Sequence, residues 1–160
     1  MPGEPVQYEY VGIEDLAMRF AYDRVKEAYL HRNWNLKTTP CAVLMREREV
    51  LAWALAADGR HAIEGTCARL WSKGTDYSTC KWCAEDQHAE QIALRRLKEQ
   101  NIVRKPTHLY LYGHWRMCDS CILAASSAGV EHFVLLKNAT ELFDRHHKNT
   151  VIGKPRQFEL

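Results

Sequence analysis

The segment that decides the fold spans residues 88–136 and reads HAEQIALRRLKEQNIVRKPTHLYLYGHWRMCDSCILAASSAGVEHFVLL. It divides into four parts with different patterns: 88–101, 107–113, 118–129 and 131–136. Apolar residues and good helix formers in the first and third parts predict helices, whereas the short apolar runs in the second and fourth predict strands. Asp86 precedes the first helix as its predicted cap, and Gly129 closes the second. The segment therefore predicts helix, strand, helix, strand.

The flanking segments extend this alternation in both directions. Apolar residues recur at helical spacing from Ile13 to His31, which predicts an amphipathic helix. CAVLM at 41–45 and VLAWALA at 50–56 are short apolar runs separated by a charged turn, and they predict paired, buried strands. A last short helix is predicted from Ala139 to His147. Strands joined through helices imply an α/β fold in which helices cover a mixed sheet.

The length and composition indicate one globular domain. A chain of 160 residues is long enough for one substantial core and short for two ordinary domains. Residues 1–12, with two prolines and a glycine near the start, are expected to be a flexible tail, so the domain spans 13–160. The hydrophobic fraction of 46% lies close to the globular average, which argues against disorder.

The net charge and the apolar runs restrict the partners. The net charge of +2 gives no overall basic field, which argues against a dedicated nucleic-acid-binding protein. The apolar runs are far shorter than the roughly 20 residues that cross a bilayer, and no export signal pattern precedes them, so we expect a cytoplasmic protein without a membrane partner. In such a protein the six cysteines are expected to be metal ligands or reduced thiols.

Two short motifs bring together the residues that carry chemistry. His88 and Glu90 open one predicted helix, and Cys118 and Cys121 open the next. A catalytic zinc takes three protein ligands and leaves one position for water, and helix N-termini favour the thiolate form that binds metal. Glu90 lies two residues past His88 and so on another helix face, where it is better placed to reach metal-bound water than to be a fourth ligand. The alternatives are a closed structural zinc site or buried thiols without metal.

These motifs resemble a known family. H-A-E, a helix, a strand and C-x-x-C are similar to the signature of the zinc-dependent cytidine and deoxycytidylate deaminases. The resemblance runs from about Ile13 to His147. It implies a three-layer α/β/α cytidine deaminase-like fold, a zinc ion held by His88, Cys118 and Cys121, and Glu90 as the proton shuttle.

The resemblance is closest to the deoxycytidylate deaminases, because DGRHAIEGTC at 58–67 is similar to their loop after the second strand, and Cys83 stands five residues before His88. Three positions depart from the pattern: Met117 replaces a proline, Asp58 replaces an asparagine, and Gln91-Ile92 replaces a Glu-x-Asn continuation. Such enzymes often carry a second zinc. The predicted ligands for one here are Cys67, Cys80 and Cys83, with His61 as the fourth and Cys41, in a predicted strand, as the weaker choice. The alternative is that they are ordinary loop residues.

The expected activity is hydrolytic deamination of a cytosine nucleotide or nucleoside, most specifically deoxycytidylate, by a homo-oligomer. Ala89, His114, Trp115 and Asp58 are the predicted substrate-binding residues, the aromatic ones because ring faces stack on bases. Two alternatives remain: an editing deaminase that acts on RNA or single-stranded DNA, and a deaminase of another amine-bearing ring such as guanine. A non-catalytic zinc protein is a third, which the presence of Glu90 disfavours.

Overall fold

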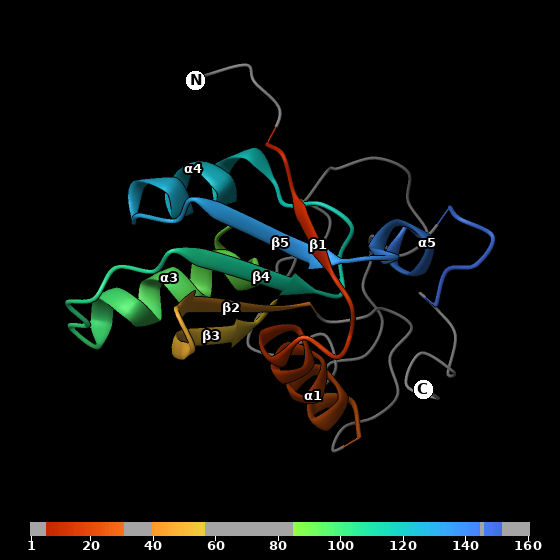
Figure 1. Cartoon of the computed structure of the whole chain (residues 1–160), viewed down its shortest axis with the longest axis horizontal. Helices are drawn as coiled ribbons and strands as arrows, with labels where there is room; N and C mark the ends of the chain where they lie inside the picture. The colour runs from red at the N-terminus through yellow and green to blue at the C-terminus, as the bar shows by residue number, and fades with distance from the viewer. Residues whose placement is uncertain (1–5, 31–39, 57–84, 145, 152–160) are drawn as a thin grey trace.

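A five-stranded mixed sheet forms the centre of the molecule in the computed structural model, which describes residues 6–30, 40–56, 85–144 and 146–151 (Figure 1). Its strands lie in the order β1-β5-β4-β2-β3. Their bounds are Glu9–Val11 for β1, Cys41–Arg46 for β2, Glu49–Leu55 for β3, His108–Tyr112 for β4 and His132–Leu136 for β5. The pairs β1–β5 and β5–β4 are parallel, and β4–β2 and β2–β3 are antiparallel.

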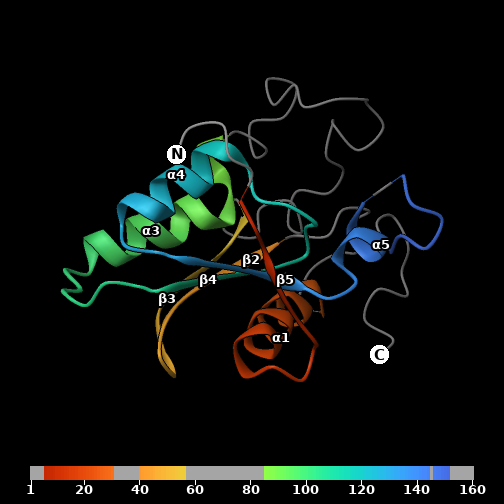
Figure 2. The same cartoon turned by 45° about the horizontal axis from the view of Figure 1, so that its top comes forward.

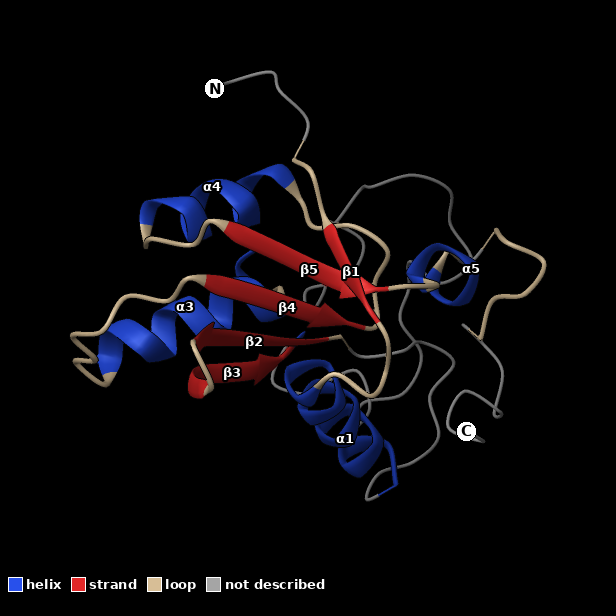
Figure 3. Ribbon diagram, in the orientation of Figure 1, coloured by secondary structure: helices blue, strands red, loops and turns tan. Residues whose placement is uncertain are grey.

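Helices cover both faces of this sheet. Their bounds are Leu16–Leu30 for α1, Ala89–Glu99 for α3, Asp119–Ser127 for α4 and Ala139–Phe143 for α5, with a short 3₁₀ helix, η4, at Glu85–Gln87. Figure 2 shows α3 and α4 together on one face and α1 on the other, and Figure 3 shows the same layers by type of element. The predicted α/β class, a mixed sheet between helical layers, is confirmed.

The core lies on both sides of the central strands. Five consecutive residues of β2 are buried, as expected for a strand covered on both faces. On the α1 face, the Tyr112 ring meets Tyr22 of α1 and Phe143 of α5 edge-on, at centroid distances of 5.4 and 5.1 Å. On β4, Leu109 and Leu111 alternate with Tyr112 and are fully buried. Burial of each such side chain contributes about 1.5–3 kcal/mol to folding.

Local sequence patterns account for the turns that bound these elements. Residues 47 and 48 form a two-residue turn between β2 and β3, and Glu47 has a φ of 54°, as such hairpin turns require. The Asp15 carboxylate accepts a hydrogen bond from the Met18 N–H and so caps α1. Gly129 ends α4 with a φ of 115°, and this confirms its predicted role.

Three predicted helix limits are wrong. Helix α1 begins at Leu16 rather than at Ile13, because Asp15 caps it. Asp86 does not cap α3; it lies in η4, and His88 is the N-cap residue instead, because a 3₁₀ turn comes between Asp86 and the helix. The Asp86 carbonyl instead accepts a hydrogen bond from Arg95 at 2.8 Å. The last helix ends at Phe143 rather than His147, because Asp144 adopts an extended conformation.

Strand β1 has no counterpart among the predicted elements. It lies within 1–12, the segment expected to be a tail, and pairs Glu9–Val11 in parallel with Val134–Leu136 of β5. The segment VQYEYV at 6–11 does alternate polar with apolar or aromatic residues, which is the signal for a half-buried strand. Pro2, Gly3 and Pro5 just before it favoured a tail. Residues 1–5 lie outside the described part.

Candidate metal centre

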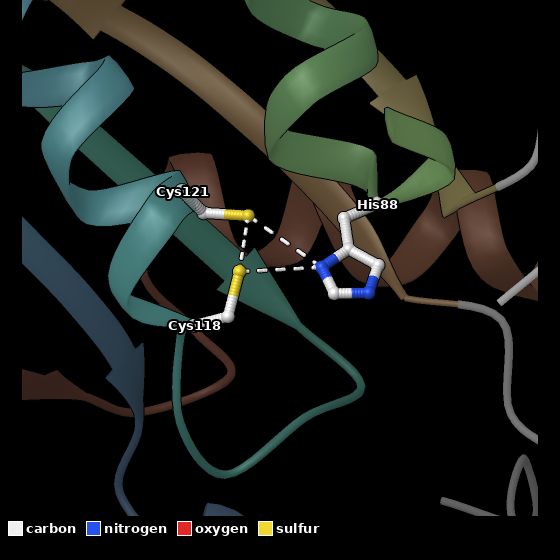
Figure 4. A group of neighbouring side chains, drawn as sticks. All are labelled: His88, Cys118 and Cys121. Atoms are coloured by element: carbon white, nitrogen blue, oxygen red, sulfur yellow. Dashed lines mark hydrogen bonds between the residues drawn. The ribbon is translucent and has the colours of Figure 1, made fainter. Parts of the chain in front are cut away.

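The first residues of two neighbouring helices form the candidate site. His88 is the N-cap residue of α3 and Cys118 that of α4, and both have extended backbone dihedral angles. An N-cap residue lies half outside its helix, so its side chain need not follow the helical stripe. Neither side chain makes a capping hydrogen bond. Because α3 and α4 pack side by side on one face of the sheet, the two side chains meet (Figure 4).

Cys121 completes a three-residue cluster from the first turn of α4. The ligand atoms of His88, Cys118 and Cys121 all lie within 4.8 Å of one another. Figure 4 shows one ring nitrogen of His88 facing the two sulfurs. This nitrogen is Nδ1, which lies 3.3 Å from Cys118 Sγ and 3.5 Å from Cys121 Sγ. The three side chains that the sequence predicted as ligands are therefore close enough to hold a metal ion.

The donor set fits zinc. Around a tetrahedral zinc, histidine nitrogen and cysteine sulfur would be about 3.5 Å apart and two sulfurs about 3.8 Å apart, from the usual bond lengths. The nitrogen-to-sulfur distances agree with this geometry. The two sulfurs are 2.7 Å apart, so a shared ion would move them apart by about 1 Å. Two thiols with one imidazole match zinc better than magnesium or calcium, which prefer oxygen ligands.

The pKa values of the two cysteine thiols shift in opposite directions. The pKa of Cys118 is lowered, first because its sulfur is hydrogen-bonded to Cys121 and further because it contacts His88 and Ser120. The pKa of Cys121 is raised, first because its sulfur is hydrogen-bonded to Cys118 and then by burial. The lowered pKa of Cys118 favours its thiolate, the form that binds metal.

Glu90 lies beside the cluster and is buried, with an exposed fraction of 5%. Burial is the main reason that its pKa is raised above the usual range for a carboxyl group. Its carboxyl group also forms a hydrogen bond with Cys121. Among the described residues, the group whose ligand atoms lie within 4.8 Å of one another contains only His88, Cys118 and Cys121, so Glu90 stands next to that group rather than in it.

Gln91 makes a contact with the cluster that the sequence analysis missed. Its side-chain Nε2 donates a hydrogen bond to Cys121 Sγ at 3.7 Å. An N–H group directed at a metal-binding sulfur orients it and partly neutralises its charge. The signal in the sequence was its place one residue after Glu90, at a position where the chain departs from the family pattern.

We expect Gln91→Leu to weaken zinc binding about tenfold without abolishing it, because outer-shell partners typically contribute this much to metal affinity. Competition with a chelator measures the affinity. Gln100→Leu is the matched control, since Gln100 is exposed at the far end of the same helix. If both variants bind zinc as tightly as the wild type, the Gln91 contact has no effect on the metal.

The loop between β4 and α4 carries two predicted substrate-binding residues. His114 Nδ1 lies 2.6 Å from the Arg116 carbonyl oxygen and 3.1 Å from the Arg116 backbone nitrogen. A protonated Nδ1 donates to the carbonyl, whereas an unprotonated Nδ1 accepts from the N–H. This nitrogen therefore holds the turn. Trp115 is 36% exposed, with the Arg116 guanidinium 5.7 Å from its ring centroid. Its ring is the exposed aromatic surface of this loop.

The other predicted site residues have different outcomes. Ala89 is buried at the start of α3, between His88 and Glu90. Asp58 and the predicted second-zinc ligands His61, Cys67, Cys80 and Cys83 all lie outside the described residues.

Tyr8 is a further contact that the sequence did not reveal. It precedes β1, and its hydroxyl group accepts a hydrogen bond from the N–H of Met117, the residue before Cys118, at 2.9 Å. The N-terminal segment thus reaches the loop that carries a predicted metal ligand.

Comparison of the chain with protein-family models, with curated proteins and with solved structures finds no match. Among the described residues, no helix is both long and apolar enough to span a membrane.

Proposed function

We propose that the protein is a zinc-dependent hydrolytic deaminase and that its substrate is a monomeric cytosine nucleotide or nucleoside, with deoxycytidylate as the first choice. The observation that supports it best is the combination of three metal-binding side chains with a buried carboxyl group beside them. Three ligands leave a fourth position for water, whereas a structural zinc site closes with four protein ligands. The carboxyl group can transfer protons, a function that a purely structural zinc site does not need.

The proposed metal ligands are His88 through Nδ1 and the sulfurs of Cys118 and Cys121. In such a site zinc lowers the pKa of water so that a nucleophile is available at neutral pH. Gln91 holds the Cys121 sulfur in place. The helix N-termini at Cys118 and His88 add partial positive charge, which favours the thiolates.

Glu90 is the proposed proton shuttle. It takes a proton from the attacking water, delivers it to N3 of the cytosine ring as the oxygen adds to C4, and then protonates the leaving amino group. The balance is water plus cytosine giving uracil plus ammonia. The buried position of Glu90 suits this role, because burial raises the pKa of its carboxyl group and so makes it a better proton acceptor than an exposed carboxylate.

Trp115 is the proposed stacking surface for the base, because it is the exposed ring in the loop that leads to Cys118. A monomeric substrate is favoured over a strand because the net charge is only +2, and strand binding needs several lysines or arginines along a groove. The resemblance to deoxycytidylate deaminases supports the choice of base and sugar.

Ammonia release from deoxycytidylate, deoxycytidine and a cytosine-containing single strand, measured at low and moderate salt, tests the substrate. We expect turnover of a monomer with little dependence on salt. Turnover of the strand alone, falling steeply as salt rises, would contradict the monomer proposal and favour an editing deaminase. If none of the three reacts, guanine and other amine-bearing rings become the substrates to test.

A further inference from the structure

We propose that Tyr8 is a positioning residue for the metal centre and that its hydroxyl group holds the backbone immediately before Cys118. This inference rests on the metal site of the proposed function but not on the identity of the substrate. The Tyr8 hydroxyl accepts the N–H of Met117 at 2.9 Å and points its own proton toward the Met117 carbonyl oxygen at 3.4 Å. The first contact has an ordinary hydrogen-bond length, whereas the second is long and therefore weaker.

The hydroxyl group is itself held in place by the sheet. Tyr8 immediately precedes β1, which pairs in parallel with β5, and the Lys137 N–H donates to the Val11 carbonyl at the other end of β1. The Tyr8 ring is partly buried against the core. The hydrogen bond from Tyr8 therefore links the loop between β4 and α4 to the sheet.

The hydrogen bond from Tyr8 supports the loop at the residue just before Cys118, the less buried of the two cysteine ligands. Cys118 is only partly buried, and as the N-cap residue it lies at the edge of α4, whereas Cys121 is fully buried within the first turn. The Met117 side chain is buried in the core, which fixes one side of the residue before Cys118. The Tyr8 hydroxyl group fixes the Met117 backbone. Together the two contacts set the position of the Cys118 backbone, and with it the position of the Cys118 sulfur.

The hydrogen bond to Tyr8 depends on which residue stands at position 117. The deaminase signature has a proline before the first cysteine, and proline has a fixed φ but no N–H group. Met117 lacks the ring constraint and supplies the N–H that Tyr8 accepts. The hydrogen bond from the N-terminal segment thus stands in for the rigidity that a proline would give at this position.

Tyr8→Phe tests the proposal because it removes the hydroxyl group and keeps the ring. We expect about tenfold weaker zinc binding by chelator competition, as for other groups that orient a metal ligand. In the cobalt-substituted protein, the sulfur-to-cobalt charge-transfer band should also change, because the position of the Cys118 sulfur changes. Tyr10→Phe is the matched control: the same change two residues away, at a ring that is 54% exposed. It should leave both readouts at wild-type values.

A double-mutant cycle with Met117→Pro separates positioning from general destabilisation. Proline removes the N–H donor, and the loss of the methionine side chain enters both arms of the cycle and cancels. The tenfold effect of Tyr8→Phe should therefore shrink to less than about twofold in the Met117→Pro background. If Tyr8→Phe weakens zinc binding equally in both backgrounds, its effect does not pass through Met117 and the proposal is overturned.

Two other results are decisive. Equal zinc affinities and equal cobalt spectra for Tyr8→Phe and Tyr10→Phe, with normal wild-type binding, would overturn this inference and leave the proposed function intact. A folded wild-type chain that binds neither zinc nor cobalt would overturn the proposed function, and this inference with it.

Discussion

Glu90→Gln is expected to lower turnover in the proposed deamination by about 10³-fold while zinc stays bound. The amide keeps the size of the buried side chain but cannot accept and release the proton. Metal content should stay at the wild-type level, because Glu90 stands next to the three-residue cluster rather than in it. Steady-state ammonia release and metal analysis of the same sample measure the two effects.

Glu99→Gln is the matched control for this variant. It makes the same change on the same helix, at an exposed residue in the last turn of α3. Its turnover should equal that of the wild type. Loss of stoichiometric zinc in Glu90→Gln would show that Glu90 is a metal ligand and would contradict its role as a shuttle.

Cys118→Ala and Cys121→Ala should each lose one zinc ion per chain relative to the wild type, together with all measurable turnover. Two remaining ligands hold a catalytic ion poorly, and metal affinity in such sites depends on the thiolates. Counting the difference from the wild type, rather than the absolute content, keeps the result clear if the chain binds a second ion. Metal analysis after gel filtration is the measurement.

Cys41→Ala separates loss of the metal site from loss of any buried thiol. Cys41 is fully buried in β2, and burial raises its pKa, so it stays a neutral thiol. This variant should keep the wild-type metal content. If Cys118→Ala or Cys121→Ala retained full activity and full metal content, the site would have been misplaced.

The sequence by itself determined those elements whose signals are local. The apolar runs of β2 and β3 and the glycine that ends α4 depend on residues within a few positions of one another. The sequence also indicated the three side chains that lie together, because His88 and Cys118 each stand at the start of a helix, and α/β folds place consecutive helix starts near one sheet edge.

The tertiary structure alone decided the contacts between distant segments. Local patterns mark 6–11 as a possible strand and Gln91 as a neighbour of the motif, but they do not give the partners. Strand β1 pairs with β5, Gln91 contacts Cys121 30 residues away, and Tyr8 contacts Met117 109 residues away. The N-cap residue of α3 is His88 and not the predicted Asp86, because a 3₁₀ turn lies between Asp86 and the helix. The physical reason is that periodicity reports which face of an element is apolar, whereas the partner of that face depends on how the strands are ordered and the helices packed.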